Sequence, residues 1–600
     1  MLTVESLSFT LPAGDPPVTL LDQVSFVLPP GHFMAIVGPS GCGKTTLLKI
    51  IAGLQVETAG RLLWRGEDIA GDGDLPASEL GYVPQFSIAH DALTVGECVE
   101  NAVKLRTTLE DAAMESMADE AIGVTGLNEL RDQRVAVLSG GQRRRLGLAM
   151  EWVSHPALLL CDEVTSGLDP QSASEIVHLL HHLSRRDGRS VVNVTHSLDD
   201  LALYDSILVL NGGRVAYHGP PEALAHYFSV PDPADIYPRL STRQPVDWHE
   251  SWLKRQAFYY SQLQAAGPGT WTLPKLPESP AEGTLHPSTV DPATPIPLPP
   301  GVSAPPNPRK LQSAALPGLW HQFLVVLGRR LTLFFRDRTH LLLHLALLVG
   351  FPLLVVLFAT NGIGAMPENP GHSDLEIREA MTVSIRAVEG QTRLGGLISG
   401  LVMFQVVLLT LMGANNASRE IAGERLIYEK ERLAGLRPAA YLLSKMVFLA
   451  VLVVAQSLWM ACFVDHFAKL PGPLFDRALL LLLVNGAMTA VCLAISALLR
   501  SPDQASLLSI YLVGFQLPLS GAVLALPEAV EKFIQPFIVS FWSWSGQLST
   551  MRPTDYFVAI NRAIPTPVLT DPNLPLTILG FHLAAGILFA WIGCLRHQWD

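Results

Sequence analysis

The strongest constraint on the fold is a series of six apolar runs in the second half of the chain. The runs cover residues 340–360, 394–414, 446–464, 478–499, 505–525 and 575–595. Each is close to the length of about 20 residues that a helix needs to cross a hydrocarbon core roughly 30 Å thick. Inside hydrocarbon every backbone polar group must be bonded within the protein, a condition that helices meet. The second half is therefore predicted to be an all-α domain of six membrane-spanning helices.

Charge predicts the orientation of these helices. The segment between the second and third runs is rich in basic residues, namely Arg419, Arg425, Lys430, Arg432, Arg437 and Lys445. Such a concentration marks a cytoplasmic loop. An even number of spans returns the chain to the side on which it started, and no signal peptide precedes the first strand-like segment. We therefore expect an integral multi-pass membrane protein with its N-terminal domain and both termini in the cytoplasm. In the outer segment 526–574, residues 533–544 are apolar but too short to cross and predict a re-entrant or interfacial helix.

Two segments of different character precede the first apolar run. Residues 266–309 are rich in proline, which predicts an extended spacer without a core. Next, apolar side chains recur at helical spacing beside arginines, a pattern typical of an interfacial amphipathic helix. A helix that packs only on protein is the alternative. We set the boundaries at 1–230 for the N-terminal domain, 231–310 for the linker, 311–338 for the amphipathic helix and 339–600 for the membrane domain.

Composition limits the partners and the compartment. The net charge is −12 and no extended basic face is present, which argues against nucleic acid as a partner. The six cysteines show neither a disulfide framework nor a zinc-binding spacing, so the soluble part is expected in a reducing cytosol.

The first 230 residues alternate short apolar strands with amphipathic helices. Residues 33–37, 157–161 and 190–194 are short runs rich in apolar residues, which suit strands buried on both faces of a parallel sheet. This pattern predicts an α/β domain.

A phosphate-binding loop follows the first of these buried strands. It reads Gly38-Pro39-Ser40-Gly41-Cys42-Gly43-Lys44-Thr45, with Thr46 next in the helix-forming run. Glycines let backbone N–H groups curl around phosphates, and the following helix N-terminus favours negative charge. Lys44 is expected to reach the β- and γ-phosphates of ATP, and the Thr45 hydroxyl to bind Mg²⁺. The chain is thus predicted to begin with a P-loop NTPase domain.

Five further elements accompany this loop in a fixed order. The strand that ends at residue 161 leads into Asp162 and Glu163, a carboxylate pair expected to hold Mg²⁺ and to polarise the attacking water, respectively. A signature segment contains Ser139, Gly140, Gly141 and Gln142 at the start of a helix. Asp169 follows the carboxylates, Gln85 follows another strand-like segment, and His196 follows the third buried strand.

With these six motifs in this order, the first 230 residues resemble the nucleotide-binding domain of ABC transporters. The resemblance implies two such domains that sandwich two ATP molecules head to tail. Each ATP would then contact the phosphate loop of one chain and the signature of the other. It also implies that His196 contacts the γ-phosphate and that Gln85 contributes to the Mg²⁺ site and signals to the membrane helices. Phe9 is the nearest candidate for stacking on adenine, and a core phenylalanine is the alternative.

The domain order resembles one branch of the family. An ATPase placed before six spans is similar to the G (White) subfamily and to bacterial relatives with type-2 permeases. The loop after the second span carries matching residues, namely Glu420, Glu424, Arg425, Tyr428, Glu431 and Arg432. The residues around His196 depart from this branch, and the external loop lacks cysteines. These differences favour a bacterial relative in the inner membrane.

One ATPase domain and six spans make half of a transporter, so the resemblance implies a dimer, most simply a homodimer. Few charges lie within the spans, which favours a small hydrophobic or amphipathic substrate. By resemblance the path lies between the second and fifth spans, with Phe404, Gln405, Phe515 and Gln516 as candidate contacts. Lipid-facing or packing roles are the alternative for both phenylalanines. The predicted function is ATP-driven export. The alternative is a membrane-anchored ATPase that signals to or pulls on a partner without moving a substrate.

Overall fold

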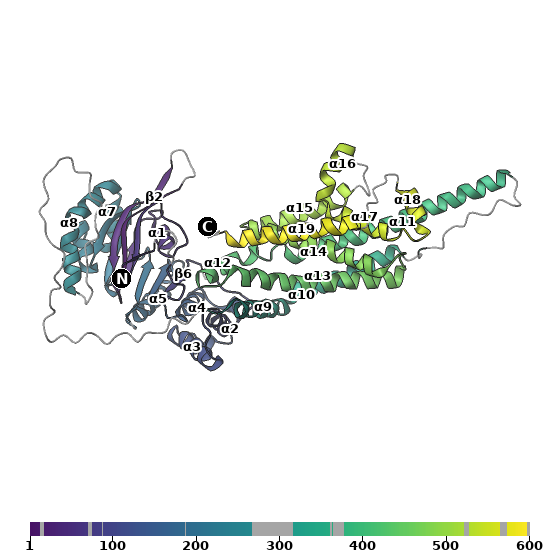
Figure 1. Ribbon diagram of the computed structural model, residues 1–600. Coiled ribbons are helices and arrows are strands. Elements are labelled where there is room, and N and C mark those ends of the chain that lie inside the picture. The colour runs from purple at the N-terminus through teal and green to yellow at the C-terminus, as the bar shows by residue number, and fades with distance from the viewer. Residues whose placement is uncertain are drawn as a thin grey trace, which may run out of the picture. The chain divides into compact units, whose positions relative to one another are not determined.

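The structure, a computed structural model, describes residues 1–11, 17–69, 75–86, 88–186, 188–266, 316–359, 363, 377–520, 527–564 and 573–596. The chain divides into two compact units. The first comprises Met1–Pro317 and Leu433–Gly435, and the second comprises Gly318–Arg432 and Leu436–Asp600. The first contains the strands, and the second consists of helices (Figure 1). The predicted order of an α/β domain followed by a helical domain is confirmed.

A six-stranded sheet forms the centre of the first unit. Its order is β10-β9-β3-β8-β7-β6, and all neighbours are parallel except β10 and β9. The strands are β3 (Phe33–Val37), β6 (Leu80–Val83), β7 (Leu158–Asp162), β8 (Ser190–Val194), β9 (Ser206–Asn211) and β10 (Arg214–Gly219). Every residue of β3, β7 and β8 is buried, as their near-continuous apolar runs predict. Because β3, β7 and β8 are parallel, the segments that follow them emerge at one edge of the sheet.

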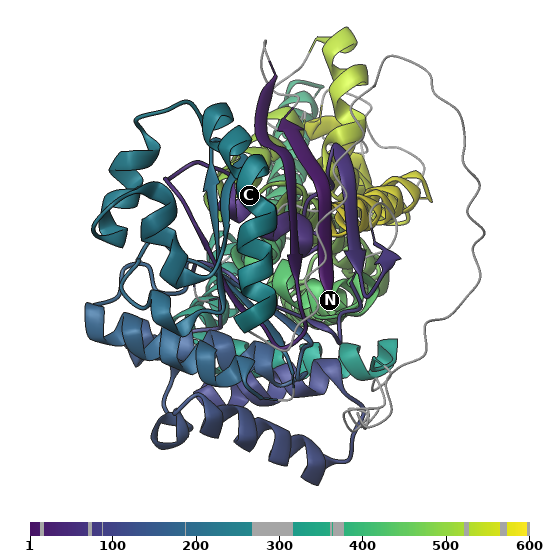
Figure 2. The ribbon, with the colours of Figure 1, turned by 90° about the vertical axis from the view of Figure 1, so that its left-hand side faces the viewer.

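An antiparallel sheet and five main helices complete the predicted α/β domain in this unit. The sheet order is β2-β1-β4-β5, and its long strands run side by side in Figure 2. The strands are β1 (Leu2–Leu11), β2 (Val18–Leu28), β4 (Ala59–Trp64) and β5 (Glu67–Asp68). The helices are α1 (Lys44–Ile51), α2 (Val95–Arg106), α3 (Asp111–Val124), α4 (Gly140–Trp152) and α5 (Pro170–Ser184).

The first unit extends beyond the predicted boundary at residue 230. Three more helices, α6 (Leu224–Phe228), α7 (Ile236–Leu240) and α8 (Pro245–Ala266), follow the last strand. Most aromatic side chains of α8 are buried, with exposed fractions of 3% for Trp248, 2% for Trp252 and 3% for Tyr260, whereas Phe258 is exposed. The prediction that a linker starts at residue 231 is therefore wrong, because these rings bury enough apolar surface to fix the helices on the domain. Most of the proline-rich spacer falls within 267–315, outside the described residues.

The second unit is a bundle of helices. Its helices are α9 (Leu319–Arg336), α10 (Arg338–Phe358), α11 (Ile377–Ala417), α12 (Arg425–Leu433), α13 (Pro438–Ala468), α14 (Leu474–Leu498), α15 (Pro502–Gln516), α16 (Glu528–Ile534), α17 (Val539–Thr550), α18 (Tyr556–Ala563) and α19 (Asn573–Leu595). Within the described residues, five helical segments are long and apolar enough to cross a membrane. They overlap the first four predicted runs and the sixth. The fifth run starts in α15, whose 15 residues span about 22 Å, and its last residues lie outside the described part.

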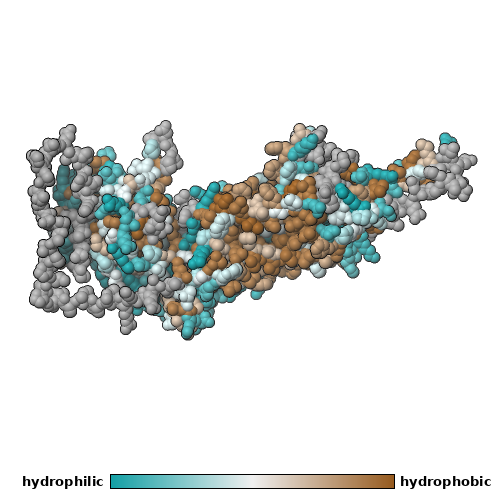
Figure 3. Space-filling model, in the orientation of Figure 1, coloured by the Kyte–Doolittle hydropathy of each residue, from teal (hydrophilic) through white to brown (hydrophobic). Residues whose placement is uncertain are grey.

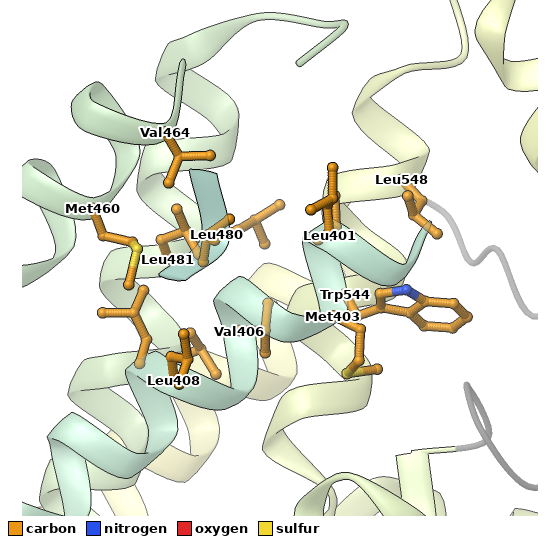
Figure 4. Close-up of a cluster of buried hydrophobic side chains, with 14 of the residues drawn as sticks. Leu401, Met403, Val406, Leu408, Met460, Val464, Leu480, Leu481, Trp544 and Leu548 are labelled. Carbon is orange, nitrogen blue, oxygen red and sulfur yellow. The ribbon is translucent and has the colours of Figure 1, made fainter. Parts of the chain in front are cut away.

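Helix α14 lies at the centre of the bundle, packed against α11, α13, α17 and α19. Side chains from α11, α13, α14 and α17 form a continuous apolar core (Figure 4). A Cβ added at Gly586 or Gly593 of α19 would lie within 2.8 Å of Ala490 or Ala497 of α14, so these small residues let two helices approach closely.

The outer face of the bundle is also apolar. Figure 3 shows a broad hydrophobic surface over the helices of the second unit, and Leu353, Val451, Leu507 and Phe581 are among the exposed side chains. A large apolar surface of this kind suits contact with lipid or with another membrane helix. The region predicted as a re-entrant or interfacial helix forms α16, the short turn after it and α17, whose side chains from Val539 to Ser549 are buried.

Candidate nucleotide site

The predicted phosphate loop joins β3 to α1 at the edge where the parallel strands end. Lys44, the first residue of α1, donates from Nζ to the backbone oxygens of Gly38 at 2.9 Å and Pro39 at 3.0 Å. Gly43 caps α1 with φ +98°, and a Cβ there would lie 2.7 Å from the Leu20 carbonyl oxygen, so glycine is required. A Cβ at Gly41 would meet no heavy atom within 4 Å. The loop thus keeps open space beside its backbone, as a phosphate cradle needs.

The remaining predicted loop residues differ in exposure. Ser40 is exposed, Thr46 is half-buried, and Cys42 is buried at 4% exposure. Burial raises the pKa of the Cys42 thiol, while Lys44 lowers it. The net rise keeps the thiol protonated and suits a packing role.

Thr45 and Asp162 meet at the end of the loop. Thr45 Oγ1 donates to Asp162 Oδ1 at 3.0 Å, although 117 residues separate the two. The Tyr82 hydroxyl, on β6, donates to the other carboxylate oxygen at 3.4 Å. Sequence reasoning missed Tyr82, whose only signal is its place inside a buried strand. Two oxygen ligands from α1 and β7 therefore stand together, an arrangement that fits Mg²⁺.

The Asp162 carboxyl has an altered pKa. Burial raises the pKa above its usual range and the charge of Glu163 raises it further, while the hydrogen bonds from Thr45 and Tyr82 lower it. A buried carboxylate next to a second carboxylate favours an added positive charge. The two adjacent carboxylates therefore fit a divalent cation at this position.

Glu163 is held between two other predicted residues. Its Oε2 accepts a hydrogen bond from Gln85 Nε2 at 2.9 Å, and its Oε1 lies 2.7 Å from His196 Nε2. Glu163 has φ +47°, in the left-handed region that non-glycine residues rarely adopt. Its backbone N–H donates to the Val194 oxygen at 3.0 Å, which anchors this strained residue to β8. The structure thus brings together the three residues predicted to act in catalysis.

The signature residues lie in a separate pocket of the same unit. Ser139 caps α4, and its Oγ accepts from the Gln142 backbone at 3.3 Å while Gln142 Oε1 accepts from Ser139 N at 2.9 Å. A cavity of about 270 Å³ is lined by Ser139, Gly141, Gln142, Arg145, Ser172 and Glu175, among others. Gly140 neighbours Leu168. No residue of the phosphate loop lines this cavity.

Asp169 is placed at the start of α5 beside this pocket. Its side chain accepts a hydrogen bond from the Ser172 backbone at 3.0 Å and caps the helix. That hydrogen bond lowers the pKa of the Asp169 carboxyl, so the carboxylate is ionised at neutral pH.

Together, a phosphate loop after β3, a carboxylate pair after β7 and a helix-capping signature serine define an ATP-binding cassette ATPase domain. Comparison with known proteins agrees with this class and extends it to the second unit. The family model "ABC transporter" matches residues 21–166, and the model "ABC-2 type transporter" matches residues 321–548. The chain belongs to the ABC transporter family, with an ATP-binding domain ahead of an ABC-2 type membrane domain, which confirms the predicted family and order.

Several relatives resemble all or part of the chain. The ABC transporter ATP-binding/permease protein Rv1747 of Mycobacterium tuberculosis is 29% identical over 92% of this chain and 57% of its own length. The lipoprotein-releasing system ATP-binding protein LolD 1 of Rhodopseudomonas palustris is 35% identical over 36% of this chain and 98% of its own length. The methionine import ATP-binding protein MetN of Corynebacterium diphtheriae is 33% identical over 36% of this chain and 64% of its own length.

A solved dimer of the ATP-binding cassette MJ0796 with ADP and Pi is 28% identical with a TM-score of 0.34, covering 37% of this chain and 99% of that one. The chain itself spans between 57% and 65% of the length of the first four of the curated relatives it matches.

The second unit contains a buried ionic cluster made of Arg330, Glu420, Glu424, Tyr441 and Lys445. Arg330 on α9 donates to both carboxylate oxygens of Glu420, at 2.5 and 2.7 Å. Lys445 Nζ on α13 lies 3.1 Å from Glu420 and also contacts Glu424, which accepts from the Tyr441 hydroxyl at 2.7 Å. The side chains of Arg330, Glu420 and Lys445 are 14%, 7% and 2% exposed. These charges are thus removed from water and depend on one another.

The other predicted residues of this loop contact the last helix and α9. The Tyr428 hydroxyl donates to the Cys594 oxygen at 2.8 Å, and Arg432 donates to the Cys594 and Leu595 oxygens at 3.2 and 3.1 Å. Arg425 donates to the carbonyl oxygens of Ala497 and Gly593, and Glu431 pairs with Arg329. Helix α12 therefore caps the C-terminal end of α19 with cations, where the helix dipole is negative.

The four candidate path residues fall into two groups. Phe515 is 58% exposed, and Phe404 is half-buried against the ring of Phe358 at 5.5 Å. Gln405 is 2% exposed, and Gln516 is fully buried with its Oε1 accepting from the Ser540 backbone at 3.1 Å. The phenylalanines alone among the four reach the surface of the unit.

Proposed function

We propose that this protein is an ATP-driven membrane transporter that exports a small hydrophobic or amphipathic molecule. The observation that supports it most is the convergence of Gln85 and His196 on Glu163, beside the Thr45–Asp162 pair. This site shares a chain with a bundle whose apolar helices suit a bilayer. The cytoplasmic face of a bacterial inner membrane is the proposed place of the ATPase domain.

Each residue of the site has a role in the proposed hydrolysis of ATP. Lys44 is aimed at the mouth of the phosphate loop, where it can exchange its bonds to Gly38 and Pro39 for phosphate oxygens. Glu163 accepts the proton of the attacking water, and Gln85 and His196 hold its two carboxylate oxygens in place. Thr45 and Asp162 are the residues that would hold Mg²⁺. When bound, this ion neutralises charge on the phosphates.

We further propose that each working site is shared by two copies of the chain. The signature pocket contains Ser139 and Gly141 but no residue of the phosphate loop. A capped helix N-terminus facing open space favours an anion that another molecule presents. A C2 homodimer would supply two such sites by symmetry.

Complementation between two inactive variants tests the shared site. We expect Lys44→Ala and Ser139→Arg to abolish ATP hydrolysis when each is purified alone. A doubly tagged dimer of the two variants keeps one site in which Lys44 of one chain faces Ser139 of the other. That dimer should recover about half of the wild-type rate, because one of its two shared sites is intact. Phosphate release at saturating ATP measures the recovery, and a rate equal to that of the single variants would contradict the shared site.

Transport is tested with the purified chain in proteoliposomes, with ATP supplied on the side of the ATPase domain. The probe is a short-chain fluorescent phospholipid, which has the amphipathic character that a pathway with few charges favours. We expect ATP-dependent movement of the probe across the bilayer, with Glu163→Gln as the inactive control. Hydrolysis that moves neither this probe nor a set of hydrophobic dyes would favour the alternative function, in which the helices act on a partner.

A further inference from the structure

Helix α7, outside the predicted ATPase domain, brings a tyrosine to the nucleotide site. The Tyr237 hydroxyl donates to the backbone oxygen of His196 at 3.0 Å. The backbone N–H of Gly38 faces the same phenol group and lowers its pKa. The phenol group thus lies between the loop that carries His196 and the first residue of the phosphate loop. Neither the six motifs nor the matched family segments contain this residue.

The position of Tyr237 is set by its own rigid support. Ile236 and Leu240, on either side of it in α7, are each 1% exposed. The Leu240 oxygen accepts a hydrogen bond from the buried Trp248 indole at 3.1 Å, which ties α7 to α8. A ring held in this way positions its hydroxyl with little freedom. The contact with His196 is therefore a built feature of the helical extension.

The Tyr237 hydroxyl can act as a hydrogen-bond donor at every pH near neutrality. Burial raises the pKa of Tyr237 to about 12, so the hydroxyl keeps its proton at neutral pH. The proton of the phenol goes to the backbone oxygen of His196. Because this bond involves a backbone group, it orients the His196 loop without contacting the reacting atoms.

We infer that Tyr237 is a positioning residue for ATP hydrolysis, which fixes the His196 loop against the phosphate loop and so keeps His196 on Glu163. Two contacts link these residues: the Tyr237 hydroxyl donates to the His196 backbone oxygen, and the imidazole Nε2 lies 2.7 Å from Glu163 Oε1. Releasing the peptide would let the imidazole leave the carboxylate. The extension α6–α8 thereby becomes part of the catalytic domain. This inference rests on the proposed hydrolysis of ATP.

The test is the full-length chain with Tyr237→Phe, which keeps the ring and removes the hydroxyl. We expect kcat for ATP to fall about three- to tenfold, the effect of losing one or two hydrogen bonds. KM should stay within about twofold, because Lys44 and the phosphate loop still bind ATP. In a His196→Ala background the same substitution should leave kcat unchanged, since the group that it positions is gone.

Tyr260→Phe is the matched control, because Tyr260 lies in the same extension and its hydroxyl bonds the buried His218 Nδ1 at 2.9 Å, away from the site. Thermal unfolding of both variants measures any loss of stability. Equal kcat for Tyr237→Phe and wild type would overturn the inference, as would an additive loss in the His196→Ala background. A wild-type chain that does not hydrolyse ATP would instead contradict the proposed function.

Discussion

Replacing Glu163 with Gln is expected to lower the rate of ATP hydrolysis by about 10²- to 10⁴-fold, the usual contribution of a general base. The amide has nearly the same shape as the carboxylate, so it can still accept the hydrogen bond that Gln85 Nε2 makes at 2.9 Å. It has no charge and cannot accept a proton from water. ATP binding should therefore persist, since Lys44 and the phosphate loop are untouched. Phosphate release and binding of a fluorescent ATP analogue measure the two properties separately.

Glu100→Gln provides the control for this variant. Glu100 lies on α2 and pairs with Arg131 at 3.3 Å, outside the nucleotide site. Its loss removes one carboxylate from the same domain and should leave turnover within about twofold of wild type, because the pair is partly exposed and surface pairs contribute about 0–1 kcal/mol. Turnover of Glu163→Gln close to that of the control would show that another group takes the proton.

The second large effect is expected in the ionic cluster of the membrane unit. Glu420→Ala removes the carboxylate that contacts both Arg330 and Lys445. These cations are only 14% and 2% exposed, so neither can recover full hydration. Removing one partner from a buried ion pair costs about 3–5 kcal/mol, because an uncompensated charge stays buried. At about 2–4 °C per kcal/mol, the thermal midpoint in detergent should fall by roughly 6–20 °C.

Asp503→Ala is the matched control, because Asp503 pairs with Arg419 at 3.2 Å in the same unit while both side chains are 61–79% exposed. Water can replace the lost Asp503 carboxylate beside Arg419, so the free energy of unfolding should fall by only about 0–1 kcal/mol. If Glu420→Ala does not yield folded protein, Glu420→Gln keeps the volume and allows the measurement. Equal midpoints for the Glu420 variant and the control would show that the cluster is hydrated.

Motif spacing predicted most residues of the nucleotide site. The phosphate loop, Asp162, Glu163, Gln85 and His196 each follow a strand-like segment, and parallel strands bring such segments to one edge. The proximity of these residues could therefore be predicted from the sequence. Tyr82 and Tyr237 could not, since a tyrosine in a strand or a short helix has no spacing that distinguishes it from a packing residue.

The boundary at residue 230 failed for a similar reason. Helix α8 has a weak apolar pattern, and its burial depends on rings such as Trp252 and Tyr260 meeting Tyr217 and His218 of β10. Proline in the next segment predicted a linker, and the predicted linker was placed too far toward the N-terminus. The aromatic contacts join residues more than 30 positions apart, which local composition does not report.

By itself, the sequence determined the two kinds of domain, the elements of the phosphate loop and the apolar lengths of the helices. These properties depend on local spacing, backbone freedom and hydrophobicity, which are readable along the chain. Only the tertiary structure decided which charges are buried together, which glutamines face inward, and that Tyr237 of α7 contacts the loop of His196. Such outcomes depend on which distant side chains share a space from which water is excluded, and this is set by the packing of the whole chain.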